Sequence, residues 1–150
     1  MNVGFVGVGY MGYGIAKNLL KNNYVLFVLG NKNRKPIDRI VSEGAEEVKS
    51  YLELCSKKLD ALFICVTNSS IAKSVALKIT PHLNEKTIII DITTHNQDGS
   101  IEMEKVFSKN KIKYIECPVM GGPLQAEEGI LGGIVGGRKE IVKEAEIFLN

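Results

Sequence analysis

Short apolar runs alternate with amphipathic stretches along the whole chain. Six of these runs are continuously apolar rather than alternating, as expected for parallel strands covered on both faces of a sheet. They span Val3 to Val6, Val25 to Leu29, Ala61 to Val66, Thr87 to Asp91, Ile112 to Ile115 and Ile130 to Val135. We therefore predict strands at these six places.

Between the strands, apolar residues recur at helical spacing. One such series runs from Met11 to Leu20, and a second runs from Ile71 to Ile79, where Pro81 should stop the helix. Helices are also predicted over Ile101 to Lys109 and Lys139 to Leu149. Strands that alternate with helices of this length form βαβ units. The pattern predicts an α/β fold with a doubly wound, mostly parallel sheet, in a single domain over residues 1–150.

The composition is that of a globular domain and argues against several classes of partner. Of the 150 residues, 45% are apolar and 24% are charged, with a net charge of +2. So small a charge gives no electrostatic reason to expect nucleic acid or a membrane surface as partner. No apolar run reaches the roughly 18 residues that a membrane helix needs. The N-terminus opens directly into a strand pattern, unlike a signal peptide.

The cysteines and histidines predict neither a disulfide framework nor a metal site. The three cysteines, Cys55, Cys65 and Cys117, have no CxxC spacing, and two of them lie in apolar runs. We therefore expect a cytoplasmic protein without disulfides. The two histidines, His82 and His95, lack the spacing of metal ligands, so we expect no metal.

The strongest local signal is a glycine-rich turn, Gly7-Val8-Gly9-Tyr10-Met11-Gly12. It follows a predicted strand and opens an amphipathic helix in the first βα unit, which is the context of a dinucleotide-binding Rossmann fold. Gly7 would turn the chain, Gly9 would let the backbone approach a pyrophosphate, and Gly12 would let the helix pack against the strand. The helix N-terminus offers N–H groups and a positive dipole to the phosphates. We assign all six residues to cofactor binding.

The segment after the second predicted strand favours NADP over NAD. About 20 residues beyond the last glycine, NAD-binding folds carry an acidic residue that binds the ribose hydroxyls. Here the cations Lys32, Arg34 and Lys35 occupy that region, and no acidic residue occurs before Asp38. A lysine or arginine can pair with the 2′-phosphate of NADP, which an acidic residue would repel. We expect NADP as cofactor, assigned to Lys32 and Arg34; the alternative is a solvated basic loop that accepts NAD as well.

Several segments of the chain share the patterns of one known family. They are Gly4 to Gly12, Asn31-Lys32, Asp91 to Thr94, Cys117 to Gly122 with Ala126 and Gly129 after it, and Ile134 to Gly137. Together they resemble the β-hydroxyacid dehydrogenase family, which includes 3-hydroxyisobutyrate dehydrogenase and 6-phosphogluconate dehydrogenase. The resemblance extends over essentially the whole chain. In it, Asn31-Lys32 looks like the Asn-Arg pair of NADP-preferring members, which adds Asn31 to the cofactor residues.

The resemblance also implies roles for residues in the second half of the chain. Val66 and Thr67, where the Ala61 to Val66 strand ends, would lie near the nicotinamide side of the dinucleotide, and Thr94 would contact the nicotinamide end. Gly121 and Gly122 look like the diglycine whose backbone amides receive the substrate carboxylate. A diglycine suits this role because no side chain blocks an anion from its N–H groups.

The chain departs from the family pattern in two respects. Met120, in the predicted substrate site, replaces the usual serine, so an apolar thioether stands where a hydroxyl would bind substrate. The family's catalytic lysine lies on a helix of a second, all-helical domain, and this chain ends at Asn150. We therefore assign no catalytic residue and expect a fragment of a larger protein. His95, next to Thr94, has a pKa near neutrality, but we interpret it as a solvated loop histidine.

These observations predict the NAD(P)-binding domain of an oxidoreductase that transfers a hydride between a nicotinamide cofactor and a small 3-hydroxy acid or sugar acid. We expect the fragment to be inactive alone and the full-length protein to be a homo-oligomer. Two alternatives stay open: a non-catalytic dinucleotide-binding or regulatory module, and an enzyme for a different substrate such as an imine or a larger sugar acid.

Overall fold

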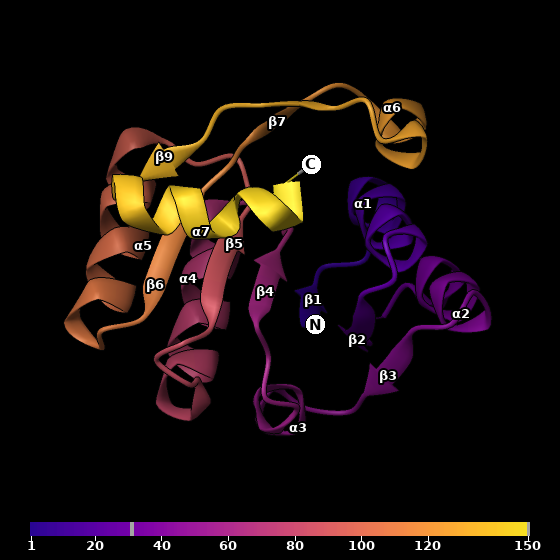
Figure 1. The fold of residues 1–150 in the computed structure, drawn as a ribbon, viewed down its shortest axis with the longest axis horizontal. Coiled ribbons are helices and arrows are strands. Elements are labelled where there is room, and N and C mark those ends of the chain that lie inside the picture. Colours follow the sequence, from indigo (N-terminus) through magenta and orange to yellow (C-terminus); the bar gives the residue numbers. More distant parts are fainter. Residues whose placement is uncertain (31, 150) are drawn as a thin grey trace.

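Helices and strands alternate along the computed structural model, which describes residues 1–30 and 32–149 (Figure 1). The first half contains β1 (Asn2–Val6), α1 (Tyr10–Lys21), β2 (Val25–Leu29), α2 (Arg34–Ser42), β3 (Glu46–Val48), α3 (Tyr51–Ser56) and β4 (Ala61–Ile64). The second half contains α4 (Ser69–Ile79), a 3-10 turn (Thr80–His82), β5 (Ile88–Asp91), α5 (Gln97–Lys109), β6 (Lys113–Glu116), β7 (Val119–Met120), α6 (Pro123–Glu128), β8 (Gly132–Gly133), β9 (Gly136–Gly137) and α7 (Lys139–Leu149).

The main sheet has the strand order β3-β2-β1-β4-β5-β6-β9, and all neighbours except β6 and β9 are parallel. The chain winds outward from β1 to β3, then crosses back so that β4 pairs with the other edge of β1. In such a sheet the place where the strand order reverses, here between β1 and β4, is where ligands bind outside the carboxyl ends of the strands. The predicted doubly wound Rossmann fold is confirmed.

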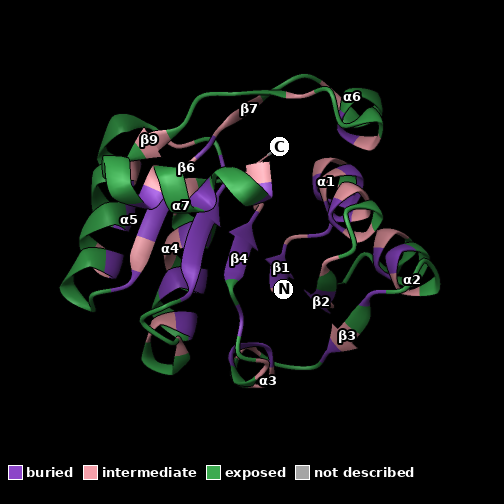
Figure 2. Cartoon of the chain, in the orientation of Figure 1, coloured by how far each residue is buried: buried purple, intermediate pink, exposed green. Residues whose placement is uncertain are grey.

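Two apolar layers cover the two faces of this sheet. On one face, the stacked rings of Phe5 and Phe63, with centroids 5.7 Å apart, lie in a core shared with α1, α2 and α7. On the other face, Leu62 and Ile89 pack in a core shared with α3, α4 and α5. Figure 2 shows the central strands buried and the segment from β7 to β9 largely exposed. Among residues 1–30 and 32–149, no helix has the length and apolarity needed to cross a membrane.

The structure corrects one predicted strand and shortens another. Residues 130–135 do not form one buried strand: Gly132–Gly133 pairs with β7, and the following Gly136–Gly137 pairs with β6. The apolar residues Ile130 and Ile134 are 64% and 62% exposed. The apolar pattern here therefore belongs to an extended arm rather than to the core. β4 ends at Ile64 rather than Val66, because the chain leaves the sheet into the turn before α4.

Some elements were missed by the sequence interpretation because their apolar signal is short. In α2 only Ile37 and Ile40 are buried, and β3 contributes the single buried side chain of Val48. The six-residue helices α3 and α6 are too short to show a full helical period. The predicted helices were found, α7 with the predicted bounds.

Candidate functional site

The glycine turn joins β1 to α1 at the point where the strand order reverses. Gly7 has a φ of +101°, and a Cβ at this position would lie 1.9 Å from the carbonyl oxygen of Cys65. A Cβ on Gly12 would lie 2.2 Å from the carbonyl oxygen of Gly7 and 3.0 Å from the ring of Phe5. Both glycines are therefore required by the protein's own packing, as the sequence predicts.

Gly9 differs from its two neighbours in the motif. It has an extended backbone as the N-cap of α1, and a Cβ added to it would meet no atom of residues 1–30 or 32–149 within 4 Å. No side chain caps this helix, and no acidic residue lies in its first turn, all of which the structure describes. The free N–H groups at a helix N-terminus and the positive end of its dipole favour an anion. The open space beside Gly9 therefore fits a pyrophosphate, whereas the packing of the domain does not explain a glycine there.

The other three residues of the turn have distinct environments. Val8 is buried in the core, Met11 is half-buried, and Tyr10 is 83% exposed on the first turn of α1. Tyr10 and Met11 are the first two residues of α1, so their backbone N–H groups belong to the helix N-terminus itself. The predicted phosphate site is thus brought together as one local structure.

The ribose end corrects the sequence interpretation. The guanidinium of Arg34 donates to both carboxylate oxygens of Glu47, at 2.6 and 2.9 Å, and to Asp38 at 2.7 Å. The same pairing lowers the pKa of Glu47 below its ordinary value. The sequence suggested that no acidic residue lies near Arg34. This expectation is wrong, because Arg34 pairs with two carboxylates. Lys32 is exposed, and Asn31 lies outside the described residues.

The acidic partner escaped the sequence interpretation because it comes from β3, which was not predicted. Glu47 stands on β3 beside β2, and a Cβ on Gly30 would lie 2.1 Å from its carboxylate oxygen Oε1. The carboxylate therefore lies against the end of β2, where an acidic residue would bind the ribose in an NAD-binding fold.

The predicted nicotinamide residues lie at the carboxyl ends of the adjacent parallel strands β4 and β5. Thr67 is exposed in the turn between β4 and α4, and Thr94 is exposed in the turn between β5 and α5. The half-buried Val66 donates its backbone N–H to Oγ1 of Thr93 at 3.2 Å, which links the two turns. The structure thus brings Val66 and Thr67 to the same edge of the sheet as Thr94.

His95 is not the solvated loop histidine that we predicted. Its side chain is 1% exposed. Nε2 lies 2.8 Å from Oδ2 of the fully buried Asp91, and Nδ1 lies 2.9 Å from Oγ of Ser69. The hydrogen bond to Asp91 raises the pKa of His95 above its ordinary 6.5. The position of Asp91 at the end of an apolar run, four residues before a histidine, was the available signal for this pair.

The predicted substrate residues lie on the arm, the segment of residues 117–137 that follows β6. Met120 is 58% exposed, and Gly121 has a φ of +131° that favours glycine. The backbone N–H of Gly122 donates to Oε1 of Gln125 at 3.0 Å. One of the two amides assigned to a substrate carboxylate is therefore already satisfied by a side chain, which the carboxylate would have to displace.

The arm returns to the first helix through α6. A Cβ on Gly14 of α1 would lie 2.6 Å from the backbone of Ala126. The two helices therefore approach too closely to admit a side chain at this position. The amide of Asn18 donates to the carbonyl oxygens of Ala126 and Glu127, at 2.7 and 3.3 Å. These contacts hold the diglycine on the same side of the molecule as the phosphate turn.

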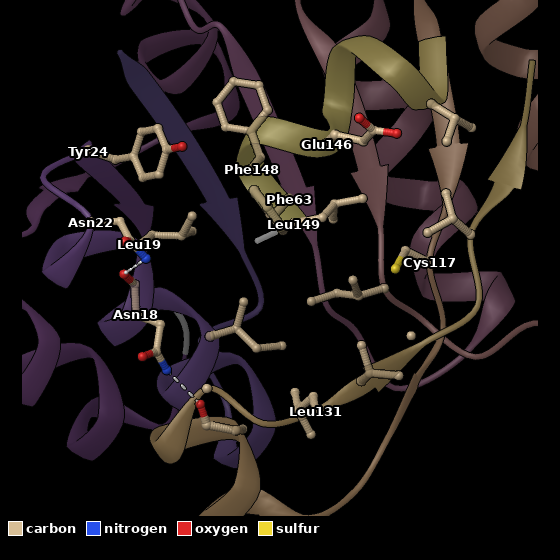
Figure 3. Close-up of a pocket in the computed structure, with 18 residues that line it drawn as sticks. Asn18, Leu19, Asn22, Tyr24, Phe63, Cys117, Leu131, Glu146, Phe148 and Leu149 are labelled. Carbon is tan, nitrogen blue, oxygen red and sulfur yellow. Dashed lines mark hydrogen bonds between the residues drawn. The ribbon is translucent and has the colours of Figure 1, made fainter. Parts of the chain in front are cut away.

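A groove of about 470 Å³ lies beneath this arm, between α1 and α7 (Figure 3). Leu19, Phe63, Cys117, Leu131 and Phe148 contribute apolar side chains to it. Of the residues assigned to the cofactor or the substrate, none that the structure describes lines it. The groove is therefore separate from the predicted dinucleotide site.

The reversal of strand order at β1 and β4, together with a phosphate turn that opens at Gly9, defines a dinucleotide-binding Rossmann domain. Residues 2–150 match the family model for the NAD binding domain of 6-phosphogluconate dehydrogenase. The chain belongs to this family, which confirms the resemblance found in the sequence.

Similar proteins include dehydrogenases of different acids. The 2-(hydroxymethyl)glutarate dehydrogenase of Eubacterium barkeri is 25% identical over 153 residues, which cover 100% of this chain and 50% of that protein. The mitochondrial 3-hydroxyisobutyrate dehydrogenase of Drosophila melanogaster is 32% identical over 137 residues, which cover 91% and 42%. Among solved structures, Psf3 in complex with NADP+ and 2-OPP matches with a TM-score of 0.90 and 29% identity, over 98% of this chain and 52% of that one. The chain spans about half the length of these proteins.

Proposed function

We propose that this chain binds a nicotinamide dinucleotide as the cofactor half of a dehydrogenase acting on a small hydroxy acid. The observation that carries the proposal is the phosphate turn, where the backbone at Gly9 is open and two flanking glycines are fixed by packing. The names of the similar dehydrogenases support the reaction class, and the NADP+ complex of Psf3 supports the cofactor class.

The fold indicates how the chain's residues would hold the cofactor. The N-terminus of α1 would receive the pyrophosphate, with the adenosine over β2 and β3 and the nicotinamide over β4 and β5. Thr67 and Thr94 would orient the nicotinamide from the two turns at its edge. When bound, the nicotinamide supplies the hydride acceptor or donor, and the protein supplies orientation and electrostatics.

The proposed preference for NADP rests on the cations Lys32 and Arg34, which follow β2 in the sequence. Arg34 is held by Asp38 and Glu47, so its positive charge is already balanced by two carboxylates. We therefore propose NADP as the favoured cofactor with a modest preference, and NAD as the alternative. The proposed substrate is a 3-hydroxy acid or a sugar acid. We propose that residues outside this chain determine which of these binds and supply the acid–base group.

Calorimetric titration of the chain with NADPH and NADH tests the proposal. We expect saturable binding of both cofactors, with NADPH tighter, and loss of both in Gly9→Val. Gly132→Val carries the same substitution to the exposed strand β8, where the nearest atom to a new Cβ is the flexible end of Met120 at 3.4 Å. This control should bind like the unmodified chain. Absence of binding by the unmodified chain would refute the proposal.

A further inference from the structure

A series of hydrogen bonds joins the two turns at the nicotinamide edge, and the backbone from Val66 to Ser69 closes it into a ring. The backbone N–H of Val66 donates to Oγ1 of Thr93, and the N–H of Thr93 donates to Oδ1 of Asp91 at 3.0 Å. Oδ2 of Asp91 is hydrogen-bonded to Nε2 of His95, and Nδ1 of His95 is hydrogen-bonded to Oγ of Ser69. The ring therefore starts on the turn after β4, passes through the turn after β5, and returns to the first turn three residues further along.

The geometry of the ring encloses the predicted contact residues. Thr67 lies between Val66 and Ser69, and Thr94 lies between Thr93 and His95. Both threonines are exposed, whereas Asp91 and Thr93 are buried, at 0% and 2% exposure. The buried members thus form a base from which two hydroxyl side chains face solvent.

The ring also fixes the starts of two helices. Ser69 is the first residue of α4, whose N-cap is Asn68, and His95 directly precedes Asn96, the N-cap of α5. A Cβ on Gly99 of α5 would lie 2.5 Å from Oγ of Ser69. The first turns of the two helices therefore approach closely at this glycine. The bond between His95 and Ser69 is therefore a polar link where the two helices begin, in addition to the ion pair between Lys73 and Glu102 further along them.

Besides Ser69, the charged and polar groups around His95 come from two neighbouring strands, β5 and β6. Asp91 accepts its Nε2 hydrogen bond, the hydroxyl of Tyr114 on β6 lies 3.5 Å from the same carboxylate oxygen, and Glu116 adds negative charge from the end of β6. Buried charges persist only when they are paired and hydrogen-bonded. Asp91 meets that requirement through Thr93 and His95, so the histidine completes a network rather than filling space.

We propose that His95 is a positioning residue: through Ser69 it holds the turns carrying Thr67 and Thr94 at the spacing that the nicotinamide end of the cofactor requires. The proposal rests on the proposed function and extends it to one further residue. His95 does not touch the cofactor; its effect is transmitted by the ring. Ligands that lack the nicotinamide should not depend on it.

The test compares NADPH with 2′-phospho-ADP-ribose, which retains the adenosine and pyrophosphate and lacks the nicotinamide. We expect His95→Ala to weaken NADPH binding about 10-fold, the order of one or two lost hydrogen bonds. Binding of 2′-phospho-ADP-ribose should change less than about twofold. His82→Ala, at the exposed second histidine, is the matched control and should leave both affinities unchanged.

A second variant keeps the test decisive if His95→Ala fails to fold. Ser69→Ala removes the hydrogen bond between His95 and Ser69, leaves the link from Val66 to Thr93, and retains the buried pair of Asp91 and His95. It should also weaken NADPH selectively, and it should add little in the His95→Ala background, because both changes break the same bond. Equal weakening of both ligands, or of neither, would overturn the role of His95. Failure of the unmodified chain to bind either ligand would instead overturn the proposed function.

Discussion

Gly9 and Gly12 offer opposite tests of the phosphate turn. Both are glycines of one motif, yet only Gly12 is surrounded by protein atoms. We expect Gly9→Val to abolish dinucleotide binding while the domain stays folded. We expect Gly12→Ala to lower the free energy of unfolding of the domain. The contrast follows from where each new side chain would go.

The magnitudes can be worked from the contacts. At Gly9 the backbone is extended, with a φ of −103° and a ψ of −153°, and no atom of the described residues lies within 4 Å of an added Cβ. The weaker N-cap and the reduced freedom of the unfolded chain act in opposite directions, so the free energy of unfolding should change by less than about 1 kcal/mol. At Gly12 a Cβ 2.2 Å from a backbone oxygen forces α1 to move, which costs about 1–3 kcal/mol. For a domain of this size that lowers Tm by roughly 2–12 °C.

The effect on binding should be larger than either change in stability. Hydrogen bonds to a charged group each contribute about 1.5–3 kcal/mol, so loss of two phosphate contacts weakens binding at least about 100-fold. Calorimetric titration with NADPH and thermal unfolding of both variants measure the two quantities separately. Unchanged affinity in Gly9→Val would place the cofactor elsewhere. An equal loss of Tm in both variants would refute the assignment of open space at Gly9.

Three further predictions concern the ribose end, the catalytic group and the buried histidine. Glu47→Gln should raise the ratio of NADPH to NADH affinity in paired titrations. It removes negative charge beside the proposed 2′-phosphate position and frees part of the Arg34 guanidinium. An unchanged ratio would show that Glu47 does not affect the choice of cofactor. The chain should bind NADP without oxidising any of a panel of 3-hydroxy acids, as followed by NADPH absorbance, because no acid–base group is assigned within it; turnover abolished by His95→Ala would contradict this. Because the folded pKa of His95 is raised, its pairing with Asp91 should stabilise the fold fully below about pH 6.5 and lose that effect as pH rises through the folded pKa. Chemical denaturation across pH should show this decline flattened in His95→Gln and retained in His82→Ala.

Sequence patterns predicted the features that depend on local spacing. Continuous apolar runs located the central strands along the chain, and the glycine motif located the turn between β1 and α1. Both signals are strong because a buried strand and a tight turn constrain every residue in them. The arm shows the limit of this reasoning, since Ile130 and Ile134 are apolar and yet exposed.

The errors at the site come from contacts between residues far apart in sequence. Arg34 meets Glu47 only because β3 lies beside β2, and His95 meets Ser69 across 26 positions of chain. No spacing rule predicts either pair. The charge of a loop or the solvation of a histidine can therefore be misjudged even where the fold is correct, because each depends on which neighbour the sheet topology supplies.

The two ends of the site differ in how far the chain itself prepares them. On the cofactor side, Gly7 and Gly12 are fixed by packing, and the ring from Val66 to Ser69 holds the nicotinamide turns. On the substrate side, Met120 is exposed and the amide of Gly122 is already bonded to Gln125. A preorganised cofactor site beside an incomplete substrate site is what the proposed division of labour requires. The cofactor contacts are preformed within this chain, whereas a substrate carboxylate would have to displace Gln125 before it could bind the amide of Gly122.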